Sequence, residues 1–233
     1  LPIWDWMKDI IIAIDGPAGS GKTTSARVVA GRLDYIYIDT GAMYRAVTLA
    51  WLRSGLPLQE ETVCRLLEST DVSLGHSHKG QVTLLNGEDV SDEIRLPEVT
   101  NHVSPISTLN CVRIKMTVLQ REMGRKGGVV MDGRDIGAFV LPFAELKIFL
   151  TASIEARAKR RMLEYEQKGI SIDIQEVKKQ ITGRDEIDST REISPLRKAE
   201  DAIVIDTSDM TIEQQTEMIY LMARKIIDGK AGA

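Results

Sequence analysis

The chain has 233 residues, 43% hydrophobic and 27% charged, a balance typical of a globular protein with one large core. Its formal net charge of −4 supplies no overall positive field for nucleic acid, so no nucleic-acid partner is expected. No apolar run reaches the roughly 18 residues of a membrane span, and residues 1–6 lack the basic start and apolar core of a signal peptide, so a cytoplasmic protein is expected.

The first motif is a glycine-rich loop. A short apolar run, residues 10–14, stops at Asp15 and is followed by a complete G-x-x-x-x-G-K-[ST] pattern. Its glycines let the backbone turn N–H groups toward an anion, and the helix that follows adds the partial positive charge of its N-terminus. Lys22 supplies a mobile charge for phosphate oxygens, and Thr23 offers its hydroxyl to Mg²⁺. A glycine turn beside a surface lysine is the alternative, but the strand before and the helix after favour a nucleoside triphosphate site.

A second strand, residues 35–38, ends in another acid, Asp39. A strand–loop–helix–strand order predicts a parallel sheet covered by helices, in which ligands bind at the carboxyl ends of the strands. The next segment could be only a helix cap with an exposed arginine. Its position at the strand end favours the alternative, in which Thr40, Tyr44 and Arg45 face a second ligand.

Residues 55–101 depart from this alternation. A helix at residues 60–69 is followed by two short alternating runs joined by a glycine-flanked turn, which predicts a β-hairpin. We interpret this antiparallel block as an insertion. Cys64 and Cys111 lie far apart in the chain and are expected as buried thiols of a reducing compartment.

A third strand, residues 127–131, ends in the charged run Asp132-Gly133-Arg134-Asp135. Such a cluster is poor core material because buried charges need partners. A plain turn is one explanation, but a location at the same sheet edge as the glycine-rich loop favours substrate recognition or the water shell of a metal. Residues 146–150 and 202–205 are the expected fourth and fifth strands.

The segment between the last two strands is predicted to be helical and rich in arginine. Two sets of charged residues fall on one helical face each: Arg157, Arg160 and Arg161, and then Arg184, Asp188 and Arg191. The second set could be a solvated ion-pair stripe. The alternative is a mobile lid that brings guanidinium groups onto phosphates.

Four motifs in this order resemble those of the nucleoside monophosphate kinases, and within them the bacterial cytidylate kinases, along nearly the whole chain. They are Gly-Pro-Ala-Gly-Ser-Gly-Lys-Thr-Thr at 16, Asp-Thr-Gly-Ala-Met-Tyr-Arg at 39, Asp-Gly-Arg-Asp-Ile-Gly at 132, and Arg-Asp-x-x-Asp-Ser-x-Arg at 184. The insertion ending in residues 86–95 is similar to the extended monophosphate-binding domain of the bacterial type.

The resemblance implies an α/β P-loop fold of three layers with a five-stranded parallel sheet, a small inserted antiparallel β domain and a helical lid. The expected divisions are a core of residues 8–54, 102–152 and 198–230, a monophosphate-binding insertion at 55–101 and a lid at 153–197. It also implies ATP-dependent phosphorylation of CMP and dCMP, with Mg²⁺ as MgATP. Nothing in the sequence demands a dimer, so a monomer is expected.

The resemblance also assigns roles to residues. The residues expected to bind ATP are Gly16, Pro17, Ala18, Gly19, Ser20, Gly21, Lys22, Thr23, Thr24, Arg157 and Arg161, with Thr23 near the metal. Those expected to bind CMP are Thr40, Tyr44, Arg45, Ser104, Arg113, Asp132, Arg134, Asp135, Arg184, Asp188 and Arg191. Lys22, Arg134, Arg184 and Arg191 are the expected catalytic residues.

Two other functions remain open on the sequence. Another small P-loop kinase could act on UMP or on the hydroxyl of a small molecule, but a hydroxyl acceptor calls for an acid placed as a base and not for four arginines. A nucleotide-dependent switch is the alternative outside the enzymes, and the guanine-reading Asn-Lys-x-Asp motif is absent from the sequence.

Overall fold

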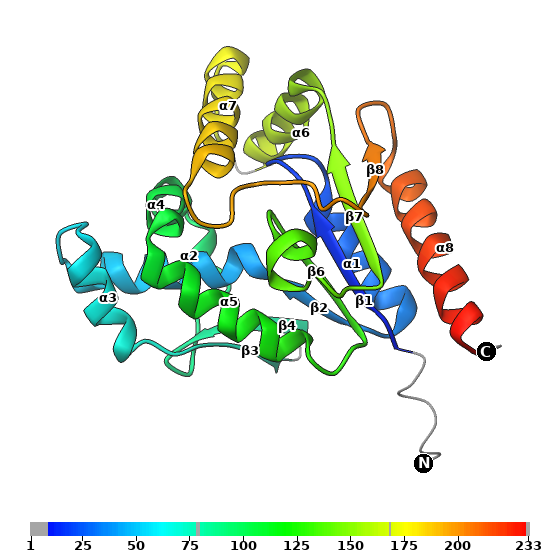
Figure 1. Ribbon diagram of the computed structural model, residues 1–233. Helices are drawn as coiled ribbons and strands as arrows, with labels where there is room; N and C mark the ends of the chain where they lie inside the picture. The colour runs from blue at the N-terminus through cyan, green and yellow to red at the C-terminus, as the bar shows by residue number, and fades with distance from the viewer. Residues whose placement is uncertain (1–8, 78–79, 168, 232–233) are drawn as a thin grey trace. The chain divides into compact units, whose positions relative to one another are not determined.

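The chain forms two compact units. The computed structural model describes residues 9–77, 80–167 and 169–231 (Figure 1). The first unit contains the chain up to Ile38 and from Met123 onward, and the second unit is Asp39–Glu122. The predicted insertion at residues 55–101 falls inside the second unit, while the expected domain boundaries stay a prediction.

A five-stranded parallel sheet, in the order β2-β6-β1-β7-β8, confirms the predicted fold class. Its strands are β1 (Ile11–Asp15), β2 (Ile36–Asp39), β6 (Val129–Gly133), β7 (Leu146–Thr151) and β8 (Ile203–Asp206). In the register of β1 with its neighbours, Asp15 lies opposite Gly133 and Phe149. The glycine-rich loop after β1 and the charged turn after β6 therefore start at the same edge of the sheet.

The continuous apolar run of β1 contributes to the core of the first unit. Ile10, Ile12 and Ile14 are fully buried and belong to one apolar cluster with residues of α1 (Lys22–Leu33) and α8 (Ile212–Ala231). Successive side chains of a strand point to opposite faces, so this spacing presents one continuous apolar face to the helices. In Figure 1 the two helices run beside the sheet.

Two helices of the first unit, α6 (Ile154–Gln167) and α7 (Ile174–Thr190), pack on each other in the segment predicted as a lid (Figure 1). Ala158, Val177 and Ile181 form their small buried cluster. A short π-helical turn, η3 (Ile136–Val140), follows the charged turn after β6.

The second unit begins at Asp39, the last residue of β2. Its elements are α2 (Thr40–Ser54), α3 (Glu60–Glu68), β3 (Val72–Ser77), β4 (Gly80–Leu85), β5 (Glu88–Asp89), η2 (Glu93–Arg95), α4 (Pro97–Thr108) and α5 (Asn110–Gly124), the last of which ends in the first unit. Strands β3, β4 and β5 form the small antiparallel sheet that the sequence predicted. Helices α4 and α5 are separated at Leu109, whose backbone is extended.

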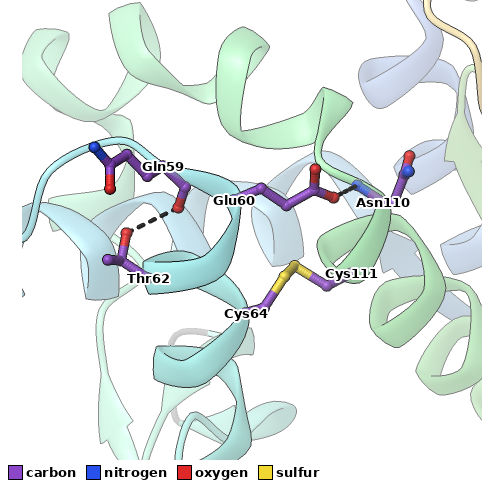
Figure 2. The surroundings of a disulfide bond; sticks show 6 residues. All are labelled: Gln59, Glu60, Thr62, Cys64, Asn110 and Cys111. Carbon is purple, nitrogen blue, oxygen red and sulfur yellow. Dashed lines mark hydrogen bonds between the residues drawn. A yellow bond between two sulfur atoms is a disulfide. The ribbon is translucent and has the colours of Figure 1, made fainter.

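The prediction that the two cysteines are thiols is wrong. Cys64 on α3 and Cys111 at the start of α5 form a disulfide, with their Cα atoms 5.6 Å apart (Figure 2). Their sequence separation of 47 hid this proximity from sequence reasoning. The Glu60 carboxylate ties the same two helices together because it accepts the backbone N–H of Asn110 at 3.1 Å. No described helix is both long and apolar enough to cross a membrane.

Breaking the disulfide should destabilise the protein. Closing a loop over a sequence separation of 47 residues removes unfolded-state entropy worth about 4 kcal/mol. Urea unfolding in the presence of a dithiol reductant should therefore give a lower free energy of unfolding than in its absence. A Cys64→Ser/Cys111→Ser variant is the control, because its unfolding should not respond to the reductant. Equal unfolding midpoints for the wild-type chain with and without reductant would contradict this prediction.

Candidate functional site

The loop after β1 has the backbone of a phosphate loop. The phosphate loop's three glycines, Gly16, Gly19 and Gly21, have positive φ angles of 146°, 77° and 93°. Residues with a Cβ atom rarely adopt such angles. At Gly16 a Cβ atom would also lie 2.0 Å from the carbonyl oxygen of Leu150, so no other residue fits there. We call residues 16–24 the phosphate loop.

Lys22, the first residue of α1, is buried in the phosphate loop. Its Nζ donates to the carbonyl oxygen of Pro17 at 2.7 Å. Burial first, and then the positive charge of Arg134, hold the pKa of Lys22 well below its ordinary value, while Asp132 acts in the opposite direction. An anion bound beside Lys22 would favour its charged form, so the electrostatics suit a phosphate.

Two hard oxygen donors meet at the start of α1. The Thr23 hydroxyl donates to Oδ2 of Asp132 at 3.0 Å, and the Tyr37 hydroxyl donates to Oδ1 of the same carboxylate at 2.7 Å. Hydroxyl and carboxylate oxygens are the ligands that Mg²⁺ prefers, either directly or through its waters. Thr23 and Asp132 therefore fit a magnesium ion that arrives with a nucleotide.

Asp15 connects the end of β1 to the turn after β6. Its two carboxylate oxygens accept the backbone N–H groups of Ile136 and Gly137, each at 2.8 Å. Burial raises the pKa of Asp15 to about 7, although both N–H groups act to lower it. The acidic strand end indicated where Asp15 lies, but this structural role had no signal in the sequence.

A buried network of charges follows the same sheet edge. Arg134 binds Asp188 at 2.8 Å, and Arg191 lies 3.5 Å from Asp188 and 3.4 Å from Asp135. Burial acts to raise the pKa of Asp188, but the charges of Arg134 and Arg184 outweigh it and hold that pKa below its usual range. The structure thus brings together two motifs that are about fifty residues apart in the chain.

The two arginines predicted as lid contacts to ATP lie in different surroundings. Arg157 is buried, donates to the carbonyl oxygens of Ala152 at 3.1 Å and Ala18 at 3.2 Å, and pairs with Asp185. The other oxygen of Asp185 accepts the backbone N–H of Ala18 at 3.4 Å. Arg161 instead pairs with Glu164 at 2.6 Å and lies over the ring of Tyr165. Arg157 therefore touches the phosphate loop itself.

The remaining predicted residues belong to the second unit. Arg113 is 1% exposed, and its guanidinium lies 5.2 Å from the ring centroid of Tyr44. Arg45 pairs with Asp39 at 3.2 Å, and Asp39 also caps α2 by accepting the N–H of Ala42. Thr40 is buried in the first turn of α2, and Ser104 lies in α4.

Arg95 in the second unit escaped sequence reasoning. Its guanidinium lies 3.6 Å from the Asp39 carboxylate, which Arg45 also contacts. The similarity of residues 86–95 to a monophosphate-binding insertion was the signal that could have found it. Two arginines on one carboxylate leave a net positive group there, which suits an anionic ligand.

The raised pKa of Asp15 predicts a specific dependence on pH. Because the folded value is about 7 against an ordinary 3.8, the folded chain holds a proton that the unfolded chain releases. The stability due to Asp15 is therefore fully present below its ordinary value and is lost as the pH rises through about 7. The carboxyl carbon resonance of Asp15 should titrate near that value. Asp15→Asn should flatten this part of the pH profile of urea unfolding, whereas Asp209→Asn, at an exposed residue, should not. A midpoint near 3.8 for Asp15 would contradict the prediction.

The chain is similar to known proteins along most of its length. Residues 12–225 match the family model of the cytidylate kinases. A cytidylate kinase of Geobacillus sp. (strain WCH70) is 52% identical over 212 residues, which are 91% of this chain and 95% of that protein. One from Carboxydothermus hydrogenoformans is 51% identical over 216 residues, 92% of this chain and 97% of that protein. The solved structure of an uncharacterized protein from Eubacterium ventriosum covers 92% of this chain and 98% of its own at a TM-score of 0.50 and 14% identity, which is a likeness of fold alone. The chain belongs to the cytidylate kinase family.

Proposed function

We propose that the chain transfers the γ-phosphoryl group of ATP to CMP and dCMP, giving ADP with CDP or dCDP. One observation carries this proposal beyond the family. The phosphate loop with its buried Lys22 starts at the same sheet edge as the turn that bears Arg134 and Asp135. A kinase whose acceptor is itself a phosphate must bring two anions together, and it needs positive charge for both.

The donor phosphates are expected in the phosphate loop. Backbone N–H groups and the N-terminus of α1 bind anions there, and Lys22 adds its charge. Thr23 and Asp132 would hold the magnesium ion of MgATP. When bound, that ion neutralises charge on the phosphate oxygens as it redistributes during transfer.

The acceptor needs no dedicated general base. An oxygen of the CMP phosphate is already anionic and attacks the γ-phosphorus in line, while the bond from that phosphorus to the β,γ-bridging oxygen breaks and ADP leaves. We assign the acceptor phosphate and the phosphoryl group in transit to four arginines: Arg45, Arg134, Arg184 and Arg191. Their contribution is positioning and electrostatic stabilisation of the transition state.

The cytosine ring is assigned to polar groups that can pair with its edge. They are Thr40, Ser104, Arg113 and Asp135, with Tyr44 lining the base site. The burial of Arg113 against Tyr44 supports this role because a hydrogen bond between a guanidinium and a ligand is stronger in a buried site than in water. Asp188 is assigned to the ribose hydroxyls. A base that mismatches these groups leaves buried polar atoms unpaired, which is a strong basis for selectivity.

We also propose that the protein is a cytoplasmic monomer.

A coupled assay of ADP release tests the proposed reaction. The acceptors are CMP, dCMP, UMP, AMP, shikimate and water, each with MgATP in excess. CMP and dCMP should give the highest turnover, and water the lowest. A faster reaction with UMP or with a hydroxyl acceptor would assign the chain to another P-loop kinase activity. Hydrolysis without acceptor at the rate seen with CMP would overturn the proposal.

Arg191→Ala should lower turnover far more than it weakens CMP binding. An arginine that neutralises the transferring group can contribute about 10³-fold or more to the rate. Steady-state kinetics with CMP as the varied substrate measure both effects. Arg224→Ala, in an exposed ion pair of α8, is the matched control and should behave as the wild type. Because Arg191 also lies in the buried charge network, the melting temperature of each variant is measured alongside. An unchanged turnover number would remove Arg191 from the catalytic set.

A further inference from the structure

The outward side of the phosphate loop is held by side chains from outside the loop. Three successive carbonyl oxygens each accept a hydrogen bond from one of them. Arg157 donates to Ala18 and Arg160 to Gly19, each at 3.2 Å, and the Thr207 hydroxyl donates to Ser20 at 3.0 Å. Arg157 already had an expected role with ATP, whereas Arg160 and Thr207 had none. We call Arg160 and Thr207 the loop brace.

Holding these carbonyl groups fixes the direction of the N–H groups. In a planar trans peptide unit the C=O and the following N–H point in opposite directions. With the carbonyl groups of residues 18–20 turned toward the brace and Arg157, the N–H groups of residues 19–21 point to the other side, where that of Ser20 also donates to the carbonyl oxygen of Pro17 at 3.4 Å. Phosphate loops bind their anion through such N–H groups. Glycine permits many backbone conformations, so a loop with glycines at 16, 19 and 21 gains order from an external support.

Packing brings the loop against the same elements. A Cβ atom on Gly19 would lie 3.1 Å from Cβ of Arg157 on α6, and one on Gly21 would lie 2.8 Å from Nε2 of Gln215 on α8. Gln215 is fully buried. The loop thus lies directly on α6 and α8, with no room for side chains between.

Within the loop brace, Thr207 is the residue that the sheet holds in place. It follows β8, is fully buried, and its backbone N–H donates to the carbonyl oxygen of Thr151 at the end of β7 at 2.8 Å. Its hydroxyl oxygen lies 3.0 Å from the carbonyl oxygens of both Ser20 and Thr151, and its single proton is donated to one of them at a time. Arg160 donates to the same hydroxyl oxygen at 3.1 Å and also to the backbone carbonyl of Thr207. The sheet, α6 and the loop are therefore joined at one residue.

We propose that Arg160 and Thr207 are positioning residues for the triphosphate: they keep the carbonyl groups of Gly19 and Ser20 turned outward, so that the loop N–H groups are aimed at the phosphates before ATP binds. The proposal rests on the proposed function for the identity of the ligand. Neither side chain needs to touch ATP. Both act through the loop backbone, so their removal should weaken ATP binding without changing how the acceptor binds.

Calorimetric titration of MgATP into the protein, without acceptor, tests the brace. Thr207→Val keeps the shape of the side chain and removes the hydroxyl, and Arg160→Gln removes the guanidinium. Each should raise the dissociation constant of MgATP by about tenfold, the usual scale for losing a group that orients binding atoms. Thr207→Ser, which keeps the hydroxyl, should stay close to the wild-type value, and KM for CMP should not follow the change.

Thr216→Val separates positioning from stability. The Thr216 hydroxyl is also buried, but it donates to Ile212 within α8. This variant should lower the melting temperature without changing ATP binding. The proposal is overturned if Thr207→Val binds MgATP as the wild type does, or if Thr216→Val weakens binding as much as Thr207→Val. Should Thr207→Val fail to fold, Arg160→Gln at its half-buried site decides the question by the same two criteria.

Wild-type protein that binds MgATP but releases no ADP with CMP would reject the proposed function and leave the test of the brace intact.

Discussion

The parallel pairing of β1 with β6 is the constraint on which the proposed donor site depends. Its register sets Asp15 opposite Gly133, so the phosphate loop and the Arg134–Asp135 turn leave the sheet side by side. Asp15 then binds the backbone just beyond that turn. Because backbone hydrogen bonds set this register, the spacing between the loop and the turn does not depend on long, mobile side chains.

Charge balance explains why so many carboxylates accompany the arginines. Buried guanidinium groups need partners, and Asp135, Asp185 and Asp188 supply them. A bound phosphate presents the same kind of oxygen to the same cations. On the proposed function, phosphate oxygens would compete with these carboxylates for the arginines, and the net gain in binding depends on how well the arginines are already oriented.

Local sequence patterns predicted much of the fold. The phosphate loop, the five strands and the hairpin were recognised because glycine spacing, short apolar runs and, in the hairpin, hydrophobic alternation act over a few residues. Periodicity also placed Asp188 and Arg191 on one side of a helix, and the structure confirms that they meet. The Cys64–Cys111 bond, the Asp15 contacts and the Thr207 brace had no such signal, because each joins segments that only the tertiary fold brings together. The assigned roles of the CMP-binding residues stay predictions.

The disulfide in the second unit turns part of the chain into a covalent ring. The segment between Cys64 and Cys111 contains the β3–β4 hairpin and α4. A protease that cuts one peptide bond inside this segment leaves two pieces that remain a single molecule until a reductant is added. A cut in the hairpin therefore does not divide the molecule. Loop exchange, inserted sequences or new chain ends could be introduced there while the flanking helices stay tethered to each other.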